Sequence, residues 1–248
     1  MSRTSALPWH AMKEQPKLRA PTQHPEAGWS VRGADLAARA WQRAPALFTA
    51  TRGRLLRMRA GAQFRALPRP YRLCLGSGQA PIDGWTNVDY YFPADVQLDL
   101  RYGIPVPDGT VELIYSEHLI EHFSIHANLL LFRECLRVLA PSGRMRIATP
   151  DLADIVRDYR SDWRRHDWTN WAEHSWIDSG TRMVNVAVRE WGHVYLWDYE
   201  ELAQRLTDVG FTSIERFGIG ESRNEALRGL ETRVDSGLIV EAGPRGQA

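Results

Sequence analysis

Short apolar runs alternate with polar turns over most of the chain after residue 70. Seven runs have the length and composition of strands, and they cover 71–75, 86–89, 95–100, 111–115, 144–149, 212–217 and 237–241. Apolar residues recur every three or four positions over 124–139 and 199–209, which predicts two helices. Pro141-Ser-Gly143 and Gly210 are expected to end them. Strands that alternate with helices predict an α/β fold built on a mostly parallel sheet.

The first 70 residues have a different character from the rest. Up to about residue 28 the chain is rich in Pro, Gln and His, which is typical of a mobile or draped arm. From Gly33 to Leu67 it is rich in Ala, Arg and Leu, and an amphipathic helix is expected there. Its apolar stripe would hold Phe48, Leu55, Met58 and Ala62, among Arg52, Arg54, Arg57, Arg59 and Arg65.

Charge is divided unevenly between these two parts. Residues 1–72 hold 14 Lys and Arg but only three acidic residues, although the formal net charge of the 248-residue chain is +1. A basic arm of this kind could meet an acidic partner, a membrane interface or nucleic acid, or it could pack on the acidic remainder. No nucleic-acid-binding motif accompanies the arginines, so nucleic acid is not expected. We expect a basic N-terminal arm over 1–70 and a separate folded domain over 71–248.

Composition excludes several classes of protein. Hydrophobic residues make up 44% and charged residues 25% of the chain, as in ordinary globular proteins. The two cysteines, Cys74 and Cys135, lie in apolar runs and cannot form a disulfide framework or a cysteine-rich zinc site. The chain shows neither a signal peptide nor an apolar run of the roughly 18–20 residues that a membrane span requires. A cytoplasmic location is therefore expected.

The turn after the first strand carries the first chemical signal. Gly76-Ser-Gly78 lets the backbone turn sharply and lets a ligand approach main-chain N–H groups. The third glycine of the dinucleotide fingerprint is absent, and Asp89 follows Gly78 by 11 residues instead of about 20, which argues against NAD. Asp89 ends the second strand, where its carboxylate could accept both hydroxyls of a ribose.

Further segments, taken in order, resemble the class I S-adenosylmethionine-dependent methyltransferases of the small-molecule or sugar type. They read LCLGSG, GWTNVD, DVQLDL, PVPDGTVELIYSEHLIEHF, ECLRVLAPSGRMRIATPDL and REWGHVYLWDYEELAQRLTDVGF. The resemblance begins at about Tyr71 and runs to the C-terminus. It implies a Rossmann-like, seven-stranded, mostly parallel sheet with an antiparallel last strand. The segment from Gly78 to Asp89 is too short for the full helix that most of these enzymes have there.

The resemblance also implies how S-adenosylmethionine would be bound. Gly76, Ser77 and Gly78 would lie against its methionine part, and Asp89 would bind the ribose hydroxyls. Asp99 and Leu100, at the end of the third strand, would frame the adenine. Ser116, Glu117 and His118, just after the fourth strand, would face the amino group and the sulfonium.

Residues 160–197 are expected to form a cap over the site, because they follow the fifth strand and hold six of the ten tryptophans. These tryptophans could form a ligand wall or cement a small helical subdomain. Within Arg189-Glu-Trp-Gly-His193, Gly192 would free the backbone to bring His193 to the acceptor as a base. A structural role for His193 is the alternative. Tyr195 follows as a further catalytic candidate.

Three residues near the strand ends complete the set of candidates. His118 is the second candidate base, since it follows the fourth strand at the cofactor edge. His122 is expected to cap or buttress the following helix. Asp151, after the fifth strand, could orient an acceptor, but N-capping of its helix is the expected role.

His118-Leu-Ile-Glu-His122 also matches the H-x-x-E-H pattern of inverted zinc peptidases, with His126 nearby. A zinc hydrolase that uses His118, Glu121 and His122 is therefore one alternative, and an inactive cofactor-binding protein is another. We treat the zinc pattern as accidental, because Tyr115 and Ser116 suggest a strand end directly before it, and we expect no metal. The expected activity is methyl transfer from S-adenosylmethionine to an oxygen or nitrogen of a small molecule or sugar.

Overall fold

A seven-stranded sheet forms the centre of the molecule. The computed structural model describes residues 46–244, and side chains from residue 51 onwards. The strands are β1 (Tyr71–Leu75), β2 (Thr86–Asp89), β3 (Val96–Gln97), β4 (Val111–Glu117), β5 (Leu139–Thr149), β6 (Thr212–Phe217) and β7 (Leu238–Gly243). They lie in the order β3-β2-β1-β4-β5-β7-β6. Strands β1 to β5 are parallel, and β7 runs antiparallel to its neighbours β5 and β6. The predicted Rossmann-like fold is confirmed.

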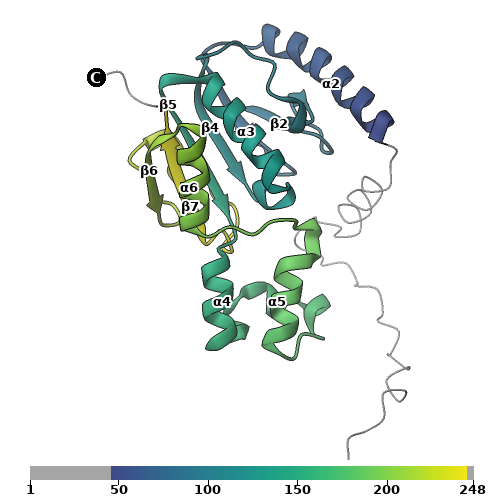
Figure 1. Cartoon of the computed structure of the whole chain (residues 1–248), viewed down its shortest axis with the longest axis vertical. Helices are drawn as coiled ribbons and strands as arrows, with labels where there is room; N and C mark the ends of the chain where they lie inside the picture. Colours follow the sequence, from purple (N-terminus) through teal and green to yellow (C-terminus); the bar gives the residue numbers. More distant parts are fainter. Residues whose placement is uncertain (1–45, 245–248) are drawn as a thin grey trace, which may run out of the picture.

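Helices lie beside this sheet and beyond its carboxyl end (Figure 1). They are α2 (Ala46–Ala66), α3 (Ile125–Val138), α4 (Leu152–Arg160), α5 (Gly180–Arg189) and α6 (Tyr199–Val209). Single 3-10 turns lie at Leu100–Tyr102, Ile120–His122, Trp163–Arg165, Asp167–Asn170, Ala172–His174, Glu190–Gly192 and Glu225–Leu227. Helices α3 and α6 contact each other side by side, and the core between helices and sheet is aliphatic and aromatic. None of the helices in residues 46–244 has the length and apolar character that a membrane span needs.

Several predicted boundaries are wrong in an informative way. The third strand is only Val96–Gln97, because Asp99 leaves the sheet and caps the turn Leu100–Tyr102 through a bond from the Arg101 N–H. The fourth strand runs two residues further than expected, so Ser116 and Glu117 belong to it. The helix before β5 ends at Val138, and the segment Pro141-Ser-Gly143 continues the strand instead of a turn. Pairing with β4 and β7 decides these ends.

Helix α2 buries a different face from the one its apolar pattern predicts. Leu55 and Met58 are 52% and 75% exposed, whereas Leu56 and Phe64 are buried. The buried face also holds small residues: a Cβ at Gly53 would overlap the ring of Tyr102. Close approach through small residues leaves no mark in a hydrophobic pattern, which explains the error. Phe48 and residues 1–45 of the predicted arm lie outside the side chains that the structure describes.

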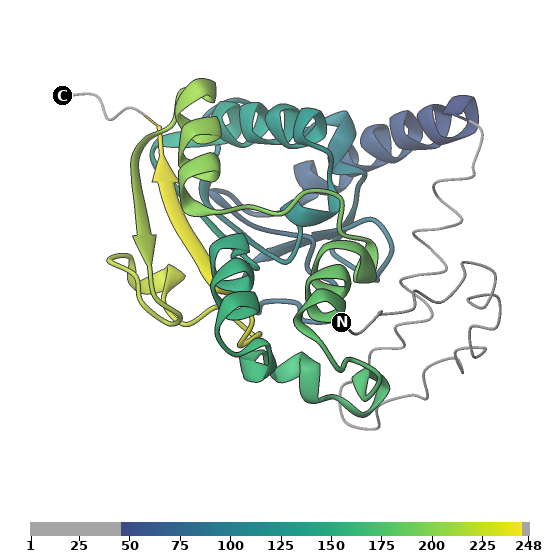
Figure 2. The same cartoon turned by 60° about the horizontal axis from the view of Figure 1, so that its bottom comes forward.

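The predicted cap is a separate helical lobe at the carboxyl end of the sheet, built from α4, α5 and the 3-10 turns between them (Figures 1 and 2). It has its own small core, to which Trp168, Ile177 and Met183 belong. The ring of Trp191 contacts the rings of Trp168 and His193, 5.4 Å and 5.6 Å away between centroids. Trp163, Trp168 and Trp191 therefore hold a helical subdomain together, which is one of the two expected interpretations.

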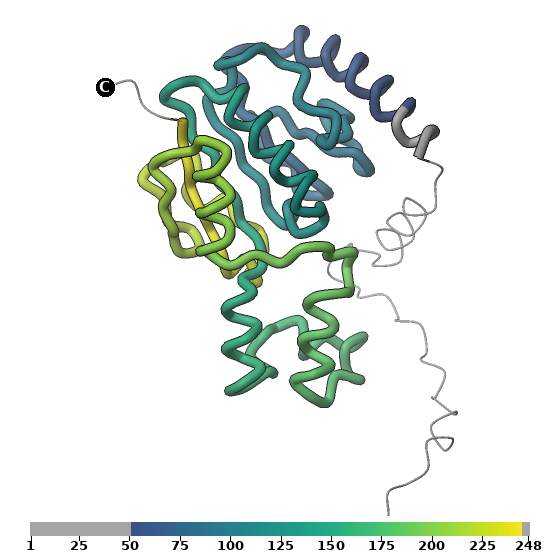
Figure 3. The backbone as a smooth tube through the Cα atoms, in the orientation of Figure 1, coloured from purple at the N-terminus to yellow at the C-terminus, as the bar shows by residue number. Residues whose placement is uncertain are grey.

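The chain enters this lobe directly after β5 and returns along the end of the sheet (Figure 3). On the way back, the N–H groups of Val194 and Tyr195 both donate to the carbonyl of Glu121, at 2.7 Å and 3.1 Å. Trp197 is fully buried in the main core and not in the lobe. The returning segment is thus fastened to the turn that follows β4.

Candidate active site

The glycine turn after β1 has the open geometry of a ligand cradle. Gly76 and Gly78 have φ angles of +71° and +54°, in the left-handed region that glycine adopts without strain. A Cβ at Gly76 would lie 2.8 Å from the Leu119 side chain, so only glycine fits there. Between them, the buried Ser77 hydroxyl makes no hydrogen bond within the described chain. A buried hydroxyl without a hydrogen-bond partner, in a turn of left-handed glycines, suits a polar ligand.

Asp89 lies at the end of β2 and closes this turn. Its Oδ2 accepts a 2.9 Å hydrogen bond from the Gly78 N–H, and its Oδ1 accepts bonds from the N–H groups of Tyr91 and Phe92 at 2.7 Å and 3.0 Å. The carboxylate is buried and held in one orientation. Each carboxylate oxygen can accept more than one hydrogen bond, so ribose hydroxyls could still be bound there.

The structure places the two residues predicted to frame the adenine at the turn that follows β3. Asp99 is buried and forms a two-bond ion pair with Arg101, with nitrogen–oxygen distances of 2.9 Å and 2.6 Å. Leu100 is buried in the main core. Any contribution of Asp99 to adenine binding would have to come from the face of its carboxylate that Arg101 leaves open.

Glu117, which was expected to face the amino group of the cofactor, holds a loop. Its carboxylate accepts five hydrogen bonds from four donors, which are the N–H and hydroxyl of Thr232, the N–H of Arg233 and the hydroxyl of Ser236. The N–H of Thr232 is shared by both carboxylate oxygens. These bonds tie the segment before β7 to the end of β4. Ser116 beside it is buried within the strand. In this structure, Glu117 is an anchor for that loop.

His118 lies beneath the same loop, in a strained conformation with φ +49°. Its side chain is 6% exposed, and its two ring nitrogens lie 3.2 Å from Glu121 Oε1 and 3.6 Å from Asp235 Oδ1. Burial holds the pKa of His118 well below its usual value of 6.5. It also raises the pKa of Asp235. His118 therefore stands between two carboxyl groups, with little access to solvent.

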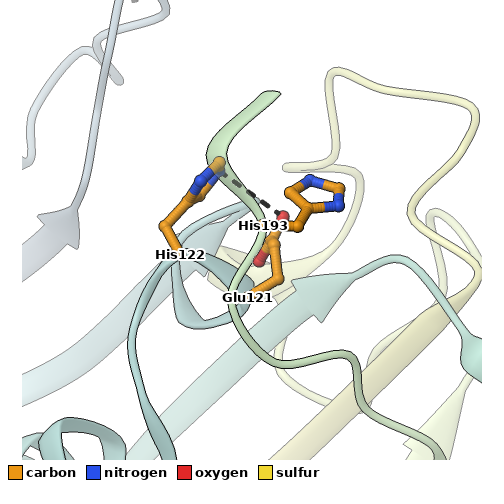
Figure 4. A group of neighbouring side chains, drawn as sticks. All are labelled: Glu121, His122 and His193. Atoms are coloured by element: carbon orange, nitrogen blue, oxygen red, sulfur yellow. Dashed lines mark ion pairs between the residues drawn. The ribbon is translucent and has the colours of Figure 1, made fainter. Parts of the chain in front are cut away.

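Three side chains meet where β4 ends and the chain returns from the lobe. Glu121 and His122 come from the turn Ile120–His122, and His193 comes from the returning segment (Figure 4). A ring nitrogen of each histidine and a carboxylate oxygen of Glu121 all lie within 4.8 Å of one another. The two imidazole rings meet edge to face, with centroids 5.2 Å apart. We call Glu121, His122 and His193 the acceptor-edge cluster.

Each member of the acceptor-edge cluster is held by a bond on its outer side. Glu121 Oε2 accepts a 2.9 Å bond from the Thr149 hydroxyl at the end of β5. His193 Nδ1 donates to the Ala187 carbonyl at 2.7 Å, and the His122 ring hydrogen bonds with the backbone of Gly192. Glu121 Oε1, fully buried, has no hydrogen-bond partner among the described residues. Oε1 of Glu121 therefore keeps lone pairs that no described residue uses.

Burial sets the charge of this cluster. It lowers the pKa of His193 below 6.5, lowers that of His122 to about 4, and raises that of Glu121. Both imidazoles are therefore neutral at pH 7. Because the Ala187 carbonyl can only accept a hydrogen bond, Nδ1 of His193 carries the proton, and its Nε2 presents a lone pair.

Left-handed backbone brings His193 to this place. Trp191 and Gly192 have φ angles of +56° and +83°, so the chain reverses directly before the histidine. This is the role that the sequence predicted for Gly192. A tryptophan in that region is strained, and its packing against Trp168 and His174 holds it there.

The structure also places Asp151, His122 and Tyr195, for which the sequence predicts roles near the site. Asp151 N-caps α4 by accepting a 2.8 Å bond from the Ala153 N–H, as expected. His122 does not cap α3, since Ser124 does so. The Tyr195 hydroxyl donates to Glu201 of α6 at 2.9 Å, and its ring packs on Trp197. Tyr195 is therefore directed away from the acceptor-edge cluster.

Sequence reasoning missed two features of this edge. Glu121 was considered only as part of the zinc pattern, and the loop that carries Thr232 and Asp235 was not considered at all. The zinc peptidase pattern requires one continuous helix, but His118 has a positive φ and only a 3-10 turn follows it. A glutamate between an apolar strand and an amphipathic helix was the available signal, since burial of such a residue requires a partner.

Comparison with known proteins gives one match of sequence and several of structure. Residues 85–147 match the family model described as a methyltransferase domain. This stretch begins just before β2 and ends within β5. Comparison with curated proteins gives no match.

Three solved structures illustrate the similarity of fold. A methyltransferase from Thermotoga maritima has 13% identity and a TM-score of 0.44, covering 81% of this chain and 96% of its own. One from Archaeoglobus fulgidus has 14% identity and a TM-score of 0.40, covering 75% and 92%. Phosphoethanolamine N-methyltransferase 2 from Haemonchus contortus, in complex with S-adenosyl-L-methionine, has 15% identity and a TM-score of 0.42, covering 76% and 52%. At these levels, the similarities do not bear on the acceptor of this chain.

The sheet order is that of a Rossmann-like fold, and the match of residues 85–147 to a methyltransferase domain supports a class I S-adenosylmethionine-dependent methyltransferase. These findings support an enzyme that uses S-adenosylmethionine as its cofactor. The Ser77 hydroxyl and the Gly76–Gly78 backbone fit such a ligand.

Proposed function

We propose that the enzyme methylates an oxygen or nitrogen atom of a small molecule or sugar, and that this acceptor binds at the acceptor-edge cluster. The observation that carries the proposal is the placement of His193, which is fixed through Nδ1 and has a ring nitrogen close to Glu121 and His122. The cofactor turn follows β1, and Glu121 follows the neighbouring parallel strand β4, so both lie at one edge of the sheet.

Chemistry at this edge makes limited demands on the protein. The bound cofactor supplies a methyl group on a sulfonium, and the acceptor's lone pair forms a bond to that carbon as the carbon–sulfur bond breaks. The chain has to align the acceptor. It also has to accept the acceptor's proton or make that proton more acidic. The neutral His193 can do this through Nε2, by direct proton acceptance or by holding an ion that activates the acceptor. His118 is the second candidate, although its ring is enclosed between Glu121 and Asp235.

The surroundings favour a small acceptor. The helical lobe stands over the carboxyl end of the sheet, and the segment that returns from it passes directly by Glu121. Trp171 and Trp176 remain 39% and 37% exposed on the lobe, and their aromatic surfaces suit stacking on a sugar or another ring. A bulky chain such as a folded protein would have to enter past this lobe.

The test replaces His193 by Asn and follows release of S-adenosylhomocysteine with a panel of sugars, phenols and amines. Turnover should fall at least about tenfold, because a positioned imidazole contributes roughly 10²–10⁴-fold in rate. Cofactor affinity, measured by calorimetry, and melting temperature should change little. His126→Asn is the matched control, since His126 is exposed on α3.

Two results would contradict the proposal. Near-normal turnover of His193→Asn would move the acceptor role to His118. A variant that is merely unstable, with normal turnover per folded molecule, would make His193 a structural residue.

A further inference from the structure

The geometry points to a divalent transition-metal ion bound by Glu121, His122 and His193. The comparisons with known proteins assign no metal site to these residues. Two imidazoles and one carboxylate form a ligand set that suits Zn²⁺, Mn²⁺ or Fe²⁺ better than Mg²⁺ or Ca²⁺, because imidazole is the softer ligand. The inference reverses our expectation from the sequence that the chain binds no metal.

The distances are compatible with one ion. Ligand atoms bound to one ion at about 2.1 Å lie at most about 4.2 Å apart. Three ligand atoms around one ion lie closer still, roughly 3.4–3.6 Å apart, so from separations of up to 4.8 Å the side chains must rotate to bring the ligand atoms about 1 Å closer together. The three side chains lie side by side, and the ion pair between His122 and Glu121 is drawn as a dashed line (Figure 4).

The outer bonds of the cluster match those of a metal site. Metal-bound histidines usually donate their second ring N–H to a backbone carbonyl or carboxylate, and bound carboxylates are themselves hydrogen bonded. His193 does so through Nδ1 to Ala187, and Glu121 accepts a bond from Thr149 on the oxygen that faces away. These bonds orient each lone pair before any ion arrives.

A second, independent observation supports the metal site: Oε1 of Glu121 is buried and has no hydrogen bond within the described residues. Glu121 is 0% exposed, yet its Oε1 has no hydrogen-bond partner in the described part of the chain. His118 Nδ1 lies 3.2 Å away without forming that bond. A buried carboxylate oxygen without a partner is costly, and a bound cation would satisfy it.

The site has three protein ligands, and the two chain segments that carry them are bonded to each other. Three protein ligands leave at least one coordination position free, as in catalytic metal sites. The N–H groups of Val194 and Tyr195 fasten the His193 segment to the Glu121 carbonyl, so the ligands are held by bonds that do not depend on the ion. A hydroxyl or amine of the acceptor could occupy the free position, and this part of the inference rests on the proposed function.

Metal binding is tested directly on the full chain. Protein stripped with a chelator is titrated with Zn²⁺ by calorimetry and with Co²⁺ by visible absorption, with Mg²⁺ as the comparison. We expect one Zn²⁺ per chain, a Co²⁺ spectrum typical of nitrogen and oxygen ligands, and much weaker binding of Mg²⁺.

Variants locate the ion. His122→Ala and His193→Ala should each weaken Zn²⁺ binding at least about tenfold, and Thr149→Val should weaken it about 10- to 100-fold by freeing the Glu121 carboxylate. His126→Ala should bind as the unchanged protein does. Because Glu121 is buried, Glu121→Gln is used only if its circular dichroism and melting curve are normal. The site would be overturned if the unchanged protein bound no Zn²⁺, or if both histidine variants bound Zn²⁺ as tightly as the unchanged protein.

Cofactor binding in the same samples separates this inference from the proposed function. If stripped protein binds S-adenosylhomocysteine and no ion binds, the metal site is wrong and the proposed function stands, with His193 accepting the proton directly. If Zn²⁺ binds as expected but no acceptor in the panel is methylated with or without it, the site stands and the proposed acceptor class is wrong.

Discussion

The backbone N–H of Gly78 donates a 2.9 Å hydrogen bond to Oδ2 of Asp89. The glycine turn after β1 and the acid that ends β2 therefore hold each other, although 11 residues separate them. One carboxylate thus shapes the turn and stays beside it for a ligand. Cofactor binding should depend on this pair.

We predict that Asp89→Ala weakens binding of S-adenosylhomocysteine by about 5- to 150-fold, equivalent to roughly 1–3 kcal/mol, because hydrogen bonds from ribose hydroxyls to a charged acceptor are lost. Calorimetry measures the change. Asp83→Ala, at an exposed position between the turn and β2, is the control. An unchanged affinity in Asp89→Ala would show that the ribose is bound elsewhere.

A second prediction concerns the buried guanidinium of Arg146. It is 0% exposed and lies 2.6 Å from Glu231 and 2.6 Å from Glu241, which joins β5 and β7 to the loop before β7. Arg146→Met should lower the free energy of unfolding by about 3–5 kcal/mol, since two buried carboxylates lose their partner. Chemical denaturation measures this.

Two companion variants show whether the cause is charge. Adding Glu231→Gln and Glu241→Gln to Arg146→Met should recover part of the loss, because the unpaired charges are removed. Arg72→Met breaks the exposed pair with Glu112 and should cost under about 1 kcal/mol. A similar loss in Arg72→Met and Arg146→Met would contradict this account.

A third prediction tests which face of α2 packs on the body. Phe64 is 1% exposed and its ring lies 5.7 Å from that of Tyr71, whereas Met58 is 75% exposed. Phe64→Ala should destabilise the protein by about 3–5 kcal/mol through loss of buried surface and the cavity that remains. Met58→Ala should change the stability by no more than about 0.5 kcal/mol. If Met58→Ala lowered the melting temperature more than Phe64→Ala did, the face of α2 predicted from the sequence would be the buried one.

A fourth prediction concerns acid stability. Two hydrogen bonds of 2.8 Å from Arg137 lower the pKa of Glu134 below its ordinary value of 4.5, and Glu134 also accepts the Ile104 N–H. The folded state therefore binds this proton more weakly than the unfolded state does. The stabilisation is present above pH 4.5 and is lost as the pH falls through the lowered pKa.

Glu134→Gln measures this effect. At pH 7 the variant should be about 1–2 kcal/mol less stable than the unchanged protein, because the charge-assisted bonds to Arg137 are weakened. The difference should shrink steadily below pH 4.5 in denaturation experiments at a series of pH values. Glu112→Gln, in the exposed pair with Arg72, is the control and should show little dependence on pH. A difference that grows in acid would have the wrong sign.

Much of the sheet was readable from the sequence because its signals are local. The run Tyr71–Leu75 followed by Gly76-Ser-Gly78 predicts a strand and an open turn, and the structure has both. Helix α6, ended by Gly210 with φ +114°, was also predicted to the residue. Apolar periodicity and glycine conformation act over a few residues, so they leave a clear pattern in the sequence.

Tertiary packing decided the features that depend on distant partners. Glu117 accepts a hydrogen bond from Thr232, 115 positions away, a contact that no local pattern in the sequence predicts. The role of Glu117 beside the cofactor, which the resemblance implies, stays a prediction. The buried face of α2 follows close contacts at Gly53, which hydrophobicity does not record.

The acceptor-edge cluster shows the same division. The sequence by itself determined that Glu121 and His122 follow β4 and that Gly192 precedes His193. Only the fold brought His193, some 70 positions later, beside Glu121, through the lobe and the bonds from Val194 and Tyr195 to the Glu121 carbonyl. Spacing along the chain carries no information on such a meeting, because it is set by where two separate elements end in space.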